Sequence, residues 1–213
     1  MKIKWLGHSA FLITSDVGVK IVTDPFTAFP NFYSDIKESA DVVLVSHEHP
    51  DHNNAAAVGG NLQVIRGAAS VKGIKFSTVS TYHDEESGKI GGNNTVFCFE
   101  VDGVKVCHLG DLGHQLTDKQ AAEIGKVDVL LIPCGGFYTI DAKGATEVSS
   151  KLAPRVVIPM HYKNNRCANH TTARIDDFLM GKTNVVWLDT SEVELKPGKL
   201  PATTQIMVLK PAL

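Results

Sequence analysis

The sequence predicts an α/β fold in which helices cover the outer faces of two packed sheets. Strand-like stretches fill the first half of the chain, whereas helix-like and strand-like stretches alternate in the second half. A sheet must bury its apolar face against another layer, so two sheets packed face to face satisfy this pattern. The 213 residues suffice for one substantial core, and we expect a single domain over residues 1–213.

The first half is expected to be mostly strand. Apolar and polar residues alternate from residue 2, and the Ser-Asp-Val-Gly turn at residues 15–18 separates two such stretches, which indicates successive antiparallel strands. The polar and aromatic residues 26–39 suit a loop with space for one short helix. We expect strands at residues 2–6, 10–14, 19–23, 41–46, 62–65, 74–81, 94–100 and 104–108, the last two forming a hairpin, and a short helix at residues 55–58.

The second half is expected to alternate helix with strand. Thr117 and Gln120 have the spacing of a capping box, which predicts a helix that runs to about residue 124. A loop rich in proline, glycine and threonine is expected at residues 196–204. The other helices are predicted at residues 146–152 and 171–180, and the strands at residues 127–133, 155–160, 185–188 and 205–209.

Composition narrows the class of protein. Hydrophobic residues make up 43% and charged residues 21%, which is typical of a globular protein. The net charge is −2 and no basic run occurs, so we expect no nucleic-acid partner. No stretch approaches the roughly 20 apolar residues of a transmembrane helix. The four cysteines form no C-x-x-C pair, and we expect a reduced, cytoplasmic protein whose oligomeric state is not predicted.

One hexapeptide concentrates the chemistry. His-Glu-His-Pro-Asp-His at residues 47–52, here called the histidine loop, directly follows an apolar strand. Imidazole nitrogen and carboxylate oxygen suit a cation such as zinc, and a catalytic zinc site keeps one position open for water. His47 and His49 would point the same way from an extended backbone, while Asp51 and His52 would turn toward a second ion. A polar surface loop is the alternative interpretation.

The pattern His-x-His-x-Asp-His after an apolar strand resembles the signature of the metallo-β-lactamase superfamily of binuclear metal hydrolases. The resemblance extends from the first residues to about Tyr162 and implies a four-layer αββα sandwich. It also implies three further ligands at later strand ends. His83, Asp111 and His161 follow predicted strands in the required order. Taken singly, His83 could be a solvated polar residue and Asp111 a turn aspartate.

The resemblance assigns these side chains to two divalent ions, with Zn²⁺ expected and Mn²⁺ or Fe²⁺ as alternatives. It implies hydrolysis, by a metal-bridging hydroxide, of an ester, lactone or phosphodiester bond in a small, anionic substrate, because the centre stays positively charged. Asp51 is the expected catalytic residue, which orients the hydroxide or passes a proton to the leaving group. The expected ligands are His47, His49 and His83 for one ion, Asp51, His52 and His161 for the other, and Asp111 between them.

Four further residues are candidates for supporting or substrate-binding roles. Asp24 could accept the second N–H of a ligand histidine, or belong to an Asp-Pro turn. His8 could line the active site or complete a turn, Gly136 could allow close backbone approach, and Tyr162 could contact an anionic group. Phe137 and Tyr138 are expected to wall the cleft. His108 is interpreted as a core or edge residue, and the positions of His108, His114 and His170 relative to the site are left open.

Within the superfamily, the segments at residues 5–9, 23–25 and 158–162 resemble the branch of ascorbate-phosphate lactonases and N-acyl phosphatidylethanolamine phospholipases D. Three alternatives remain. An iron-dependent oxidoreductase or dioxygenase has the same fold, but diiron relatives carry glutamate where this chain has His49. A nuclease-like phosphodiesterase would need an additional substrate-gripping arm. A catalytically inactive metal-binding module would be expected to lose ligands.

Overall fold

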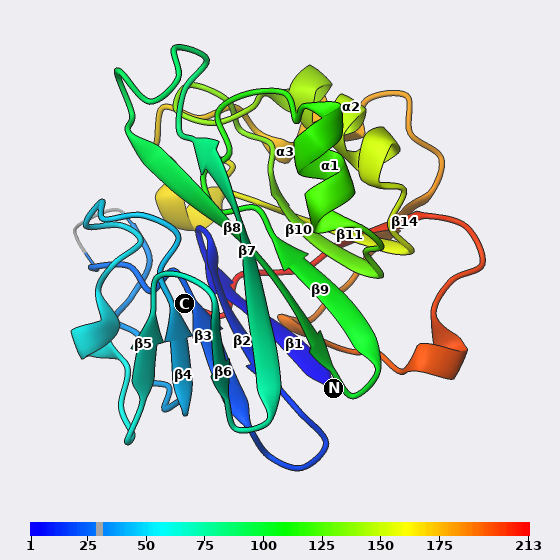
Figure 1. Ribbon diagram of the computed structural model, residues 1–213. Coiled ribbons are helices and arrows are strands. Elements are labelled where there is room, and N and C mark those ends of the chain that lie inside the picture. Colours follow the sequence, from blue (N-terminus) through cyan, green and yellow to red (C-terminus); the bar gives the residue numbers. More distant parts are fainter. Residues whose placement is uncertain (29–31) are drawn as a thin grey trace.

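Two sheets packed face to face form the protein, as seen in the computed structural model, which describes residues 1–28 and 32–213 (Figure 1). The strands of the first sheet, in spatial order, are β13 (Glu192–Glu194), β1 (Lys2–Gly7), β2 (Ala10–Thr14), β3 (Lys20–Thr23), β4 (Val42–Leu44) and β5 (Gln63–Ile65). Those of the second are β12 (Val185–Trp187), β14 (Gln205–Val208), β11 (Val156–Met160), β10 (Val129–Pro133), β9 (Val104–His108), β8 (Asn93–Val101), β7 (Ile74–Tyr82) and β6 (Ala69–Val71).

The strand directions bring distant parts of the chain to one edge. Strands β1 to β3 pair antiparallel as expected, whereas β3, β4 and β5 are parallel. In the second sheet, β9, β10 and β11 are parallel neighbours. Parallel strands end at the same edge of a sheet, so the residues that follow β9, β10 and β11 lie next to one another. Every residue of β10 and β11 is buried, as expected for strands covered on both faces.

Helices cover the outer face of the second sheet. In Figure 1, α1 (Asp118–Ile124), α2 (Ala142–Leu152) and α3 (Ile175–Leu179) gather on that side, where α1 contacts β7 and α2 contacts β10. The predicted α/β class is therefore confirmed. On the first sheet, a separate apolar cluster that includes Phe26, Tyr33 and Ile36 packs beside the 3₁₀ helix η1 (Ala55–Ala57).

Several element boundaries differ from the predictions. Helix α2 begins at Ala142 instead of residue 146, because the Asp141 carboxylate caps its start. The helix predicted at residues 171–180 is reduced to α3, because the Ala173 amide bonds to Gly135 instead. The helix predicted at residues 55–58 is a single 3₁₀ turn. The short helix allowed at residues 26–39 does not occur in the described part of that range, and residues 29–31 lie outside the described residues.

Two short edge strands, β6 and β13, were not predicted, whereas the capping box was predicted correctly. Thr117 Oγ1 accepts the Gln120 amide at 3.2 Å, and the Gln120 side chain accepts the Thr117 amide at 3.0 Å. The 3₁₀ helices η2 (Asn165–Cys167) and η3 (Pro197–Lys199) complete the fold. In the described ranges, no helix combines the length and apolar character needed to cross a membrane.

Candidate metal centre

The histidine loop leaves β4 as a tight turn instead of the extended segment that was expected. The His52 and Asn53 amides both donate to the His49 carbonyl, at 2.9 and 3.1 Å. The turn still brings the first two imidazoles together, with the ring centroids of His47 and His49 4.7 Å apart. His47 and His52 are buried, His49 is exposed, and the Asp51 side chain is 34% exposed, so the loop presents candidate ligands both inward and toward solvent.

Asp111 lies at the centre of the cluster that the predicted metal ligands form. Its Oδ2 atom lies 3.1 Å from Nε2 of both His52 and His83, 3.2 Å from Nε2 of His161 and 3.9 Å from Nε2 of His47. These contacts lower the pKa of the Asp111 carboxyl well below its ordinary value, although burial alone would raise it. One buried carboxylate oxygen is therefore surrounded by four imidazoles.

The backbone after β9 explains how Asp111 reaches this place. Gly110 has φ +55°, and a Cβ atom there would collide with the side chains of Asn94 and Ser46. Asn94 accepts the Asp111 amide at 2.9 Å and donates to the Leu109 carbonyl at 2.9 Å. Glycine at position 110 thus permits the turn, and Asn94 holds the turn in place.

Side chains from separate strand ends form three groups with metal-binding spacing. Within each group, one nitrogen or oxygen atom per residue lies within 4.8 Å of the others. The first group is one predicted ligand set, the second is the other set with His8 added, and the third joins Asp111 to one histidine from each set. They are His47, His49 and His83; His8, Asp51, His52 and His161; and His47, His52 and Asp111.

Asp24 orients two of these imidazoles. Nδ1 of His52 lies 3.2 Å from its Oδ2, and Nδ1 of His47 lies 2.9 Å from Ser46 Oγ, which donates to the same oxygen at 2.7 Å. A carboxylate can only accept, so Nδ1 of His52 carries a proton, and Nε2 is the ring nitrogen that could bind a metal. The fully buried Asp24 has a pKa below its ordinary value: burial raises it, but His108 and His52 outweigh that effect. This is the outer support that metal-binding histidines require.

His83 is oriented in the same way by the backbone. Its Nδ1 donates to the Tyr138 carbonyl at 2.7 Å, because a carbonyl oxygen can only accept. Nε2 therefore faces Asp111 without a proton in the neutral ring. Asp111 raises the pKa values of His83 and His52, against the opposing effect of burial, so protons compete with a cation for these nitrogens.

His8 is an additional member of the cluster. Its Nε2 lies 3.2 Å from Asp51 Oδ2, and its ring centroid lies 4.1 Å from that of His161. Burial, followed by the proximity of His161, lowers the pKa of His8 to about 3, so the ring is neutral. The Asp51 pKa also lies below its ordinary value, since the hydrogen bond from His8 and the charge of His52 outweigh burial.

Backbone strain concentrates around the cluster. Of the non-glycine residues with positive φ, His8 (+50°), Asp24 (+35°) and His161 (+52°) belong to it, and Phe137 (+68°) lines the adjoining cavity. Such conformations cost on the order of 1–3 kcal/mol each and persist where the surroundings impose them, which is typical of functional sites.

The residues fit a metal site by a further criterion. Among the described residues, His47 Nε2, His52 Nε2 and Asp111 Oδ1 are buried and have no hydrogen-bond partner. Leaving such atoms unsatisfied costs about 1–3 kcal/mol each, so their concentration in one place calls for a bound group. Imidazole nitrogen and carboxylate oxygen are the donors that zinc, manganese and iron accept.

A cavity of about 1010 Å³ opens from the cluster to solvent. Five of the seven predicted ligands line it, as do Gly136, Phe137 and Tyr138. Its volume lies at the upper end of the range for small-molecule sites, about 300–1,000 Å³. The cluster can therefore be reached by a substrate from one side.

A model of the family described as "Beta-lactamase superfamily domain" matches residues 2–161. The chain belongs to the metallo-β-lactamase superfamily. A UPF0173 metal-dependent hydrolase from Archaeoglobus fulgidus is 32% identical, over 93% of this chain and 97% of its own length. One from Carboxydothermus hydrogenoformans is 33% identical, over 76% and 84%. A solved Thermotoga maritima structure, described as a candidate Zn-dependent hydrolase of this superfamily, is 42% identical with a TM-score of 0.79, over 98% and 97%.

Membership in the superfamily confirms the family predicted from the histidine loop, whereas the narrower branch stays a prediction. Among the supporting candidates, His8 and Asp24 lie in the cluster and Gly136 lines the cavity. Tyr162 is not among the described residues that line this cavity. It is buried and packs against Trp5 with ring centroids 5.2 Å apart, so its contact with a substrate stays a prediction.

The other histidines differ in their relation to the candidate metal centre. His108 is fully buried, and its Nε2 donates to Asp24 at 2.8 Å, so it is more than a core or edge residue. The His170 ring lies 5.6 Å from that of His8. His114 instead accepts the Tyr82 amide, outside the cluster. Ser46 and Asn94 were missed; Ser46 directly precedes the histidine loop, but nothing local marks Asn94.

Proposed function

We propose that this protein is a binuclear metal-dependent hydrolase that cleaves an ester, lactone or phosphodiester bond in a small-molecule substrate. One observation carries the proposal: Asp111 Oδ2 lies 3.1 Å from Nε2 of His52 and of His83 and 3.2 Å from Nε2 of His161, between the two predicted ligand sets. Names of relatives that include "metal-dependent hydrolase" support the reaction class.

In this proposal each side chain has a defined task. Asp111 contributes to both ions, while Asp24, Ser46 and the Tyr138 carbonyl keep the imidazoles in the metal-binding tautomer. The ligands of one ion are His47, His49 and His83, and those of the other are Asp51, His52 and His161, with His8 beside them. Zn²⁺ is the proposed ion, with Mn²⁺ or Fe²⁺ as alternatives.

Two divalent ions held by these residues would lower the pKa of a bound water toward about 7 and polarise the bond under attack. Asp51 is the proposed catalytic residue. Its carboxylate is partly exposed toward the cavity, and His8 holds it in place through the 3.2 Å hydrogen bond. Asp51 can therefore pass a proton between solvent and the leaving group.

The proposal includes a reduced, cytoplasmic setting. All four cysteines are free, including Cys98 and Cys107, whose Sγ atoms lie only 3.7 Å apart on paired strands. The proposed setting rests on the sequence, in which the four cysteines form no C-x-x-C pair.

A hydrolase screen tests the proposed function. Protein loaded with zinc, manganese or iron is assayed on chromogenic phosphodiesters, lactones and thioesters. We expect hydrolysis of at least one class and a loss of at least about 100-fold in Asp111→Ala. Asp118→Ala, which removes an exposed carboxylate on α1, is the matched control. Undiminished activity in Asp111→Ala contradicts the proposal, and iron-dependent oxygen consumption without hydrolysis favours the oxidoreductase alternative.

A further inference from the structure

The cavity beside the candidate metal centre has two different walls. Tyr138 and Phe137 belong to one part of the lining, and Ile90, in the β7–β8 connection, belongs to the other. These side chains are 54%, 68% and 82% exposed, which is unusual for large apolar residues grouped around one cavity. The Phe137 and Tyr138 rings pack edge to face, with centroids 4.3 Å apart. The cavity therefore offers an aromatic and aliphatic surface a short way from the metal centre.

The position of this surface is imposed by strong local constraints. Gly136 and Phe137 both have positive φ, a conformation that is strained for phenylalanine. The Tyr138 carbonyl holds the ligand candidate His83. In the β7–β8 connection, the Asp84 carboxylate accepts four backbone amides between residues 86 and 91 and so fixes the loop that carries Ile90. Both walls are thus tied to His83 or to its neighbour.

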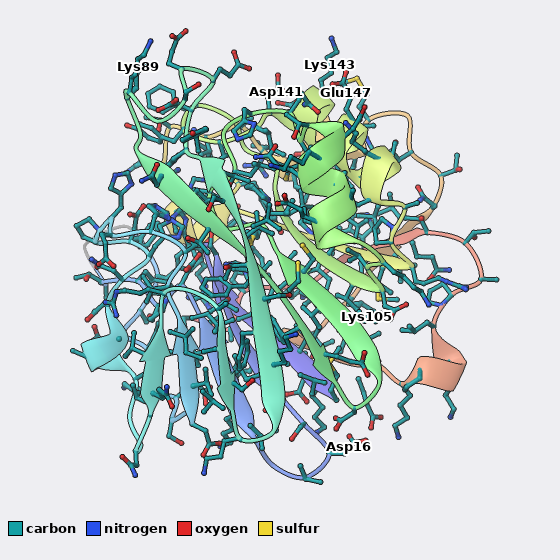
Figure 2. The ribbon with its side chains drawn as sticks, in the orientation of Figure 1. Asp16, Lys89, Lys105, Asp141, Lys143 and Glu147 are labelled. Atoms are coloured by element: carbon teal, nitrogen blue, oxygen red, sulfur yellow. The ribbon has the colours of Figure 1, made fainter. Side chains whose placement is uncertain are left out.

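Charge on the cavity wall is strongly one-sided. Beyond the proposed ligands, the described lining includes five carboxylates and a single cation, Lys143, which pairs with Glu147 at 3.9 Å. Figure 2 shows Lys143 and Glu147 together on the outer side of α2, while Lys89 points away from the tip of the β7–β8 connection. The carboxylates are Asp84, Glu85, Glu86, Asp141 and Glu147.

Helix α2 does not offset this charge. A helix N-terminus attracts anions through its free backbone amides. Here Asp141 already occupies that position, because its carboxylate accepts the Gly144 amide at 2.8 Å. Asp84 and Asp141 are bonded to backbone amides, so Glu85 and Glu86 are the carboxylates most available to a ligand. Carboxylates beside aromatic faces suit a cationic or neutral apolar group and repel an anion.

We propose that the substrate group beyond the scissile bond is apolar and neutral or positively charged, and that an anionic group there is rejected. This inference rests on the proposed function. It also limits the expectation of an anionic substrate: the positive metal centre favours negative charge only at the bond under attack, whereas the cavity favours the opposite sign. Glu85, Glu86 and Phe137 are the residues that determine this specificity.

Three hydroxamic acids of matched shape test the proposal without relying on catalysis. They are phenylacetohydroxamic acids that carry a tert-butyl, trimethylammonio or carboxylate group at the para position. Calorimetric titration of the zinc-loaded protein gives the dissociation constant of each. We expect the trimethylammonio compound to bind at least as tightly as the tert-butyl compound and at least ten-fold more tightly than the carboxylate.

Variants separate the contributions of the walls. The double variant Glu85→Gln/Glu86→Gln should reduce the ratio of the dissociation constants of the carboxylate and trimethylammonio compounds at least three-fold. Glu123→Gln, at an exposed site on α1, should leave this ratio unchanged. Phe137→Ala should weaken the binding of the tert-butyl and trimethylammonio compounds. The inference is overturned if the carboxylate compound binds as tightly as the trimethylammonio compound. It is also overturned if the ratio of their dissociation constants is the same in the double variant as in the wild type. If zinc is bound but no compound binds, the inference fails alone; if no zinc is bound, the proposed function fails and the inference with it.

Discussion

Nε2 of His108 lies 2.8 Å from Oδ2 of Asp24, and both side chains are fully buried. The same oxygen accepts from His52 and from Ser46, so a single carboxylate links β9 to the histidine loop. Neither His108 nor Ser46 is among the described residues that line the cavity. The candidate centre therefore depends on a buried network that a substrate does not reach.

Asp24→Asn should weaken zinc binding by about 10- to 100-fold, because the amide nitrogen would face the N–H groups of His52 and His108. The measurement is competition with a zinc chelator. Asp41→Asn is the control, since that carboxylate also accepts a backbone amide, from Lys20 at 2.9 Å, away from the cluster. Equal zinc affinity in wild type and Asp24→Asn would show that the network does not support the metal.

Gly110→Ala should destabilise the fold by at least about 2 kcal/mol, because the new Cβ atom collides with Asn94 and Ser46 and the backbone has φ +55°. Urea unfolding measures the change. Gly67→Ala, at a site with open space and no positive φ, should have little effect. A Gly110→Ala protein as stable as wild type would contradict the described path of the chain into Asp111.

Asp84→Asn should lower stability at neutral pH but much less at pH 2. Four backbone amides, against desolvation, lower the pKa of Asp84 from 3.8 to about 2. A lowered carboxyl pKa stabilises the fold above the unfolded-state pKa, and this contribution is lost as the pH falls from about 4 to 2. Urea midpoints of the two proteins should therefore converge over that interval. Asp35→Asn, at an exposed site, serves as control, and a constant difference from pH 7 to 2 would refute the assignment.

Zinc should raise the melting temperature of metal-free protein by several degrees. Binding at 100 times the dissociation constant adds about 2.7 kcal/mol. The shift should be smaller at pH 5.5 than at pH 7.5, because Asp111 raises the pKa values of His52 and His83 and protons compete with zinc. His52→Ala should lose most of the shift and His114→Ala should keep it, as measured by calorimetry. A shift that survives in His52→Ala would place zinc elsewhere.

Most of the fold could be predicted because its core strands have strong patterns. The buried runs that became β10 and β11 and the capping box at Thr117 were found within a few residues. The edge strands β6 and β13 were missed, because three residues such as Glu-Val-Glu carry too little periodicity to be distinguished from a loop. Helix α3 is short because the backbone of Ala173, just before it, forms hydrogen bonds to Gly135 and Lys163. No local sequence pattern indicates these tertiary bonds.

The candidate site could likewise be predicted only in part. Each predicted ligand follows a strand or a recognisable motif, so sequence order and parallel strand ends were sufficient to group them. The Asp24 network was only partly predictable, since His108 lies inside a strand and its partner is 84 residues away. The burial of Tyr162 directly after His161, which has φ +52°, could not be read from the sequence either.

Anomalous diffraction from crystals of zinc-loaded protein, recorded on both sides of the zinc absorption edge, tests the paired-cation centre most directly. The account predicts two peaks per chain, one bound by His47, His49 and His83 and one by Asp51, His52 and His161, with Asp111 contacting both. A single peak, or two peaks that Asp111 does not join, would contradict it.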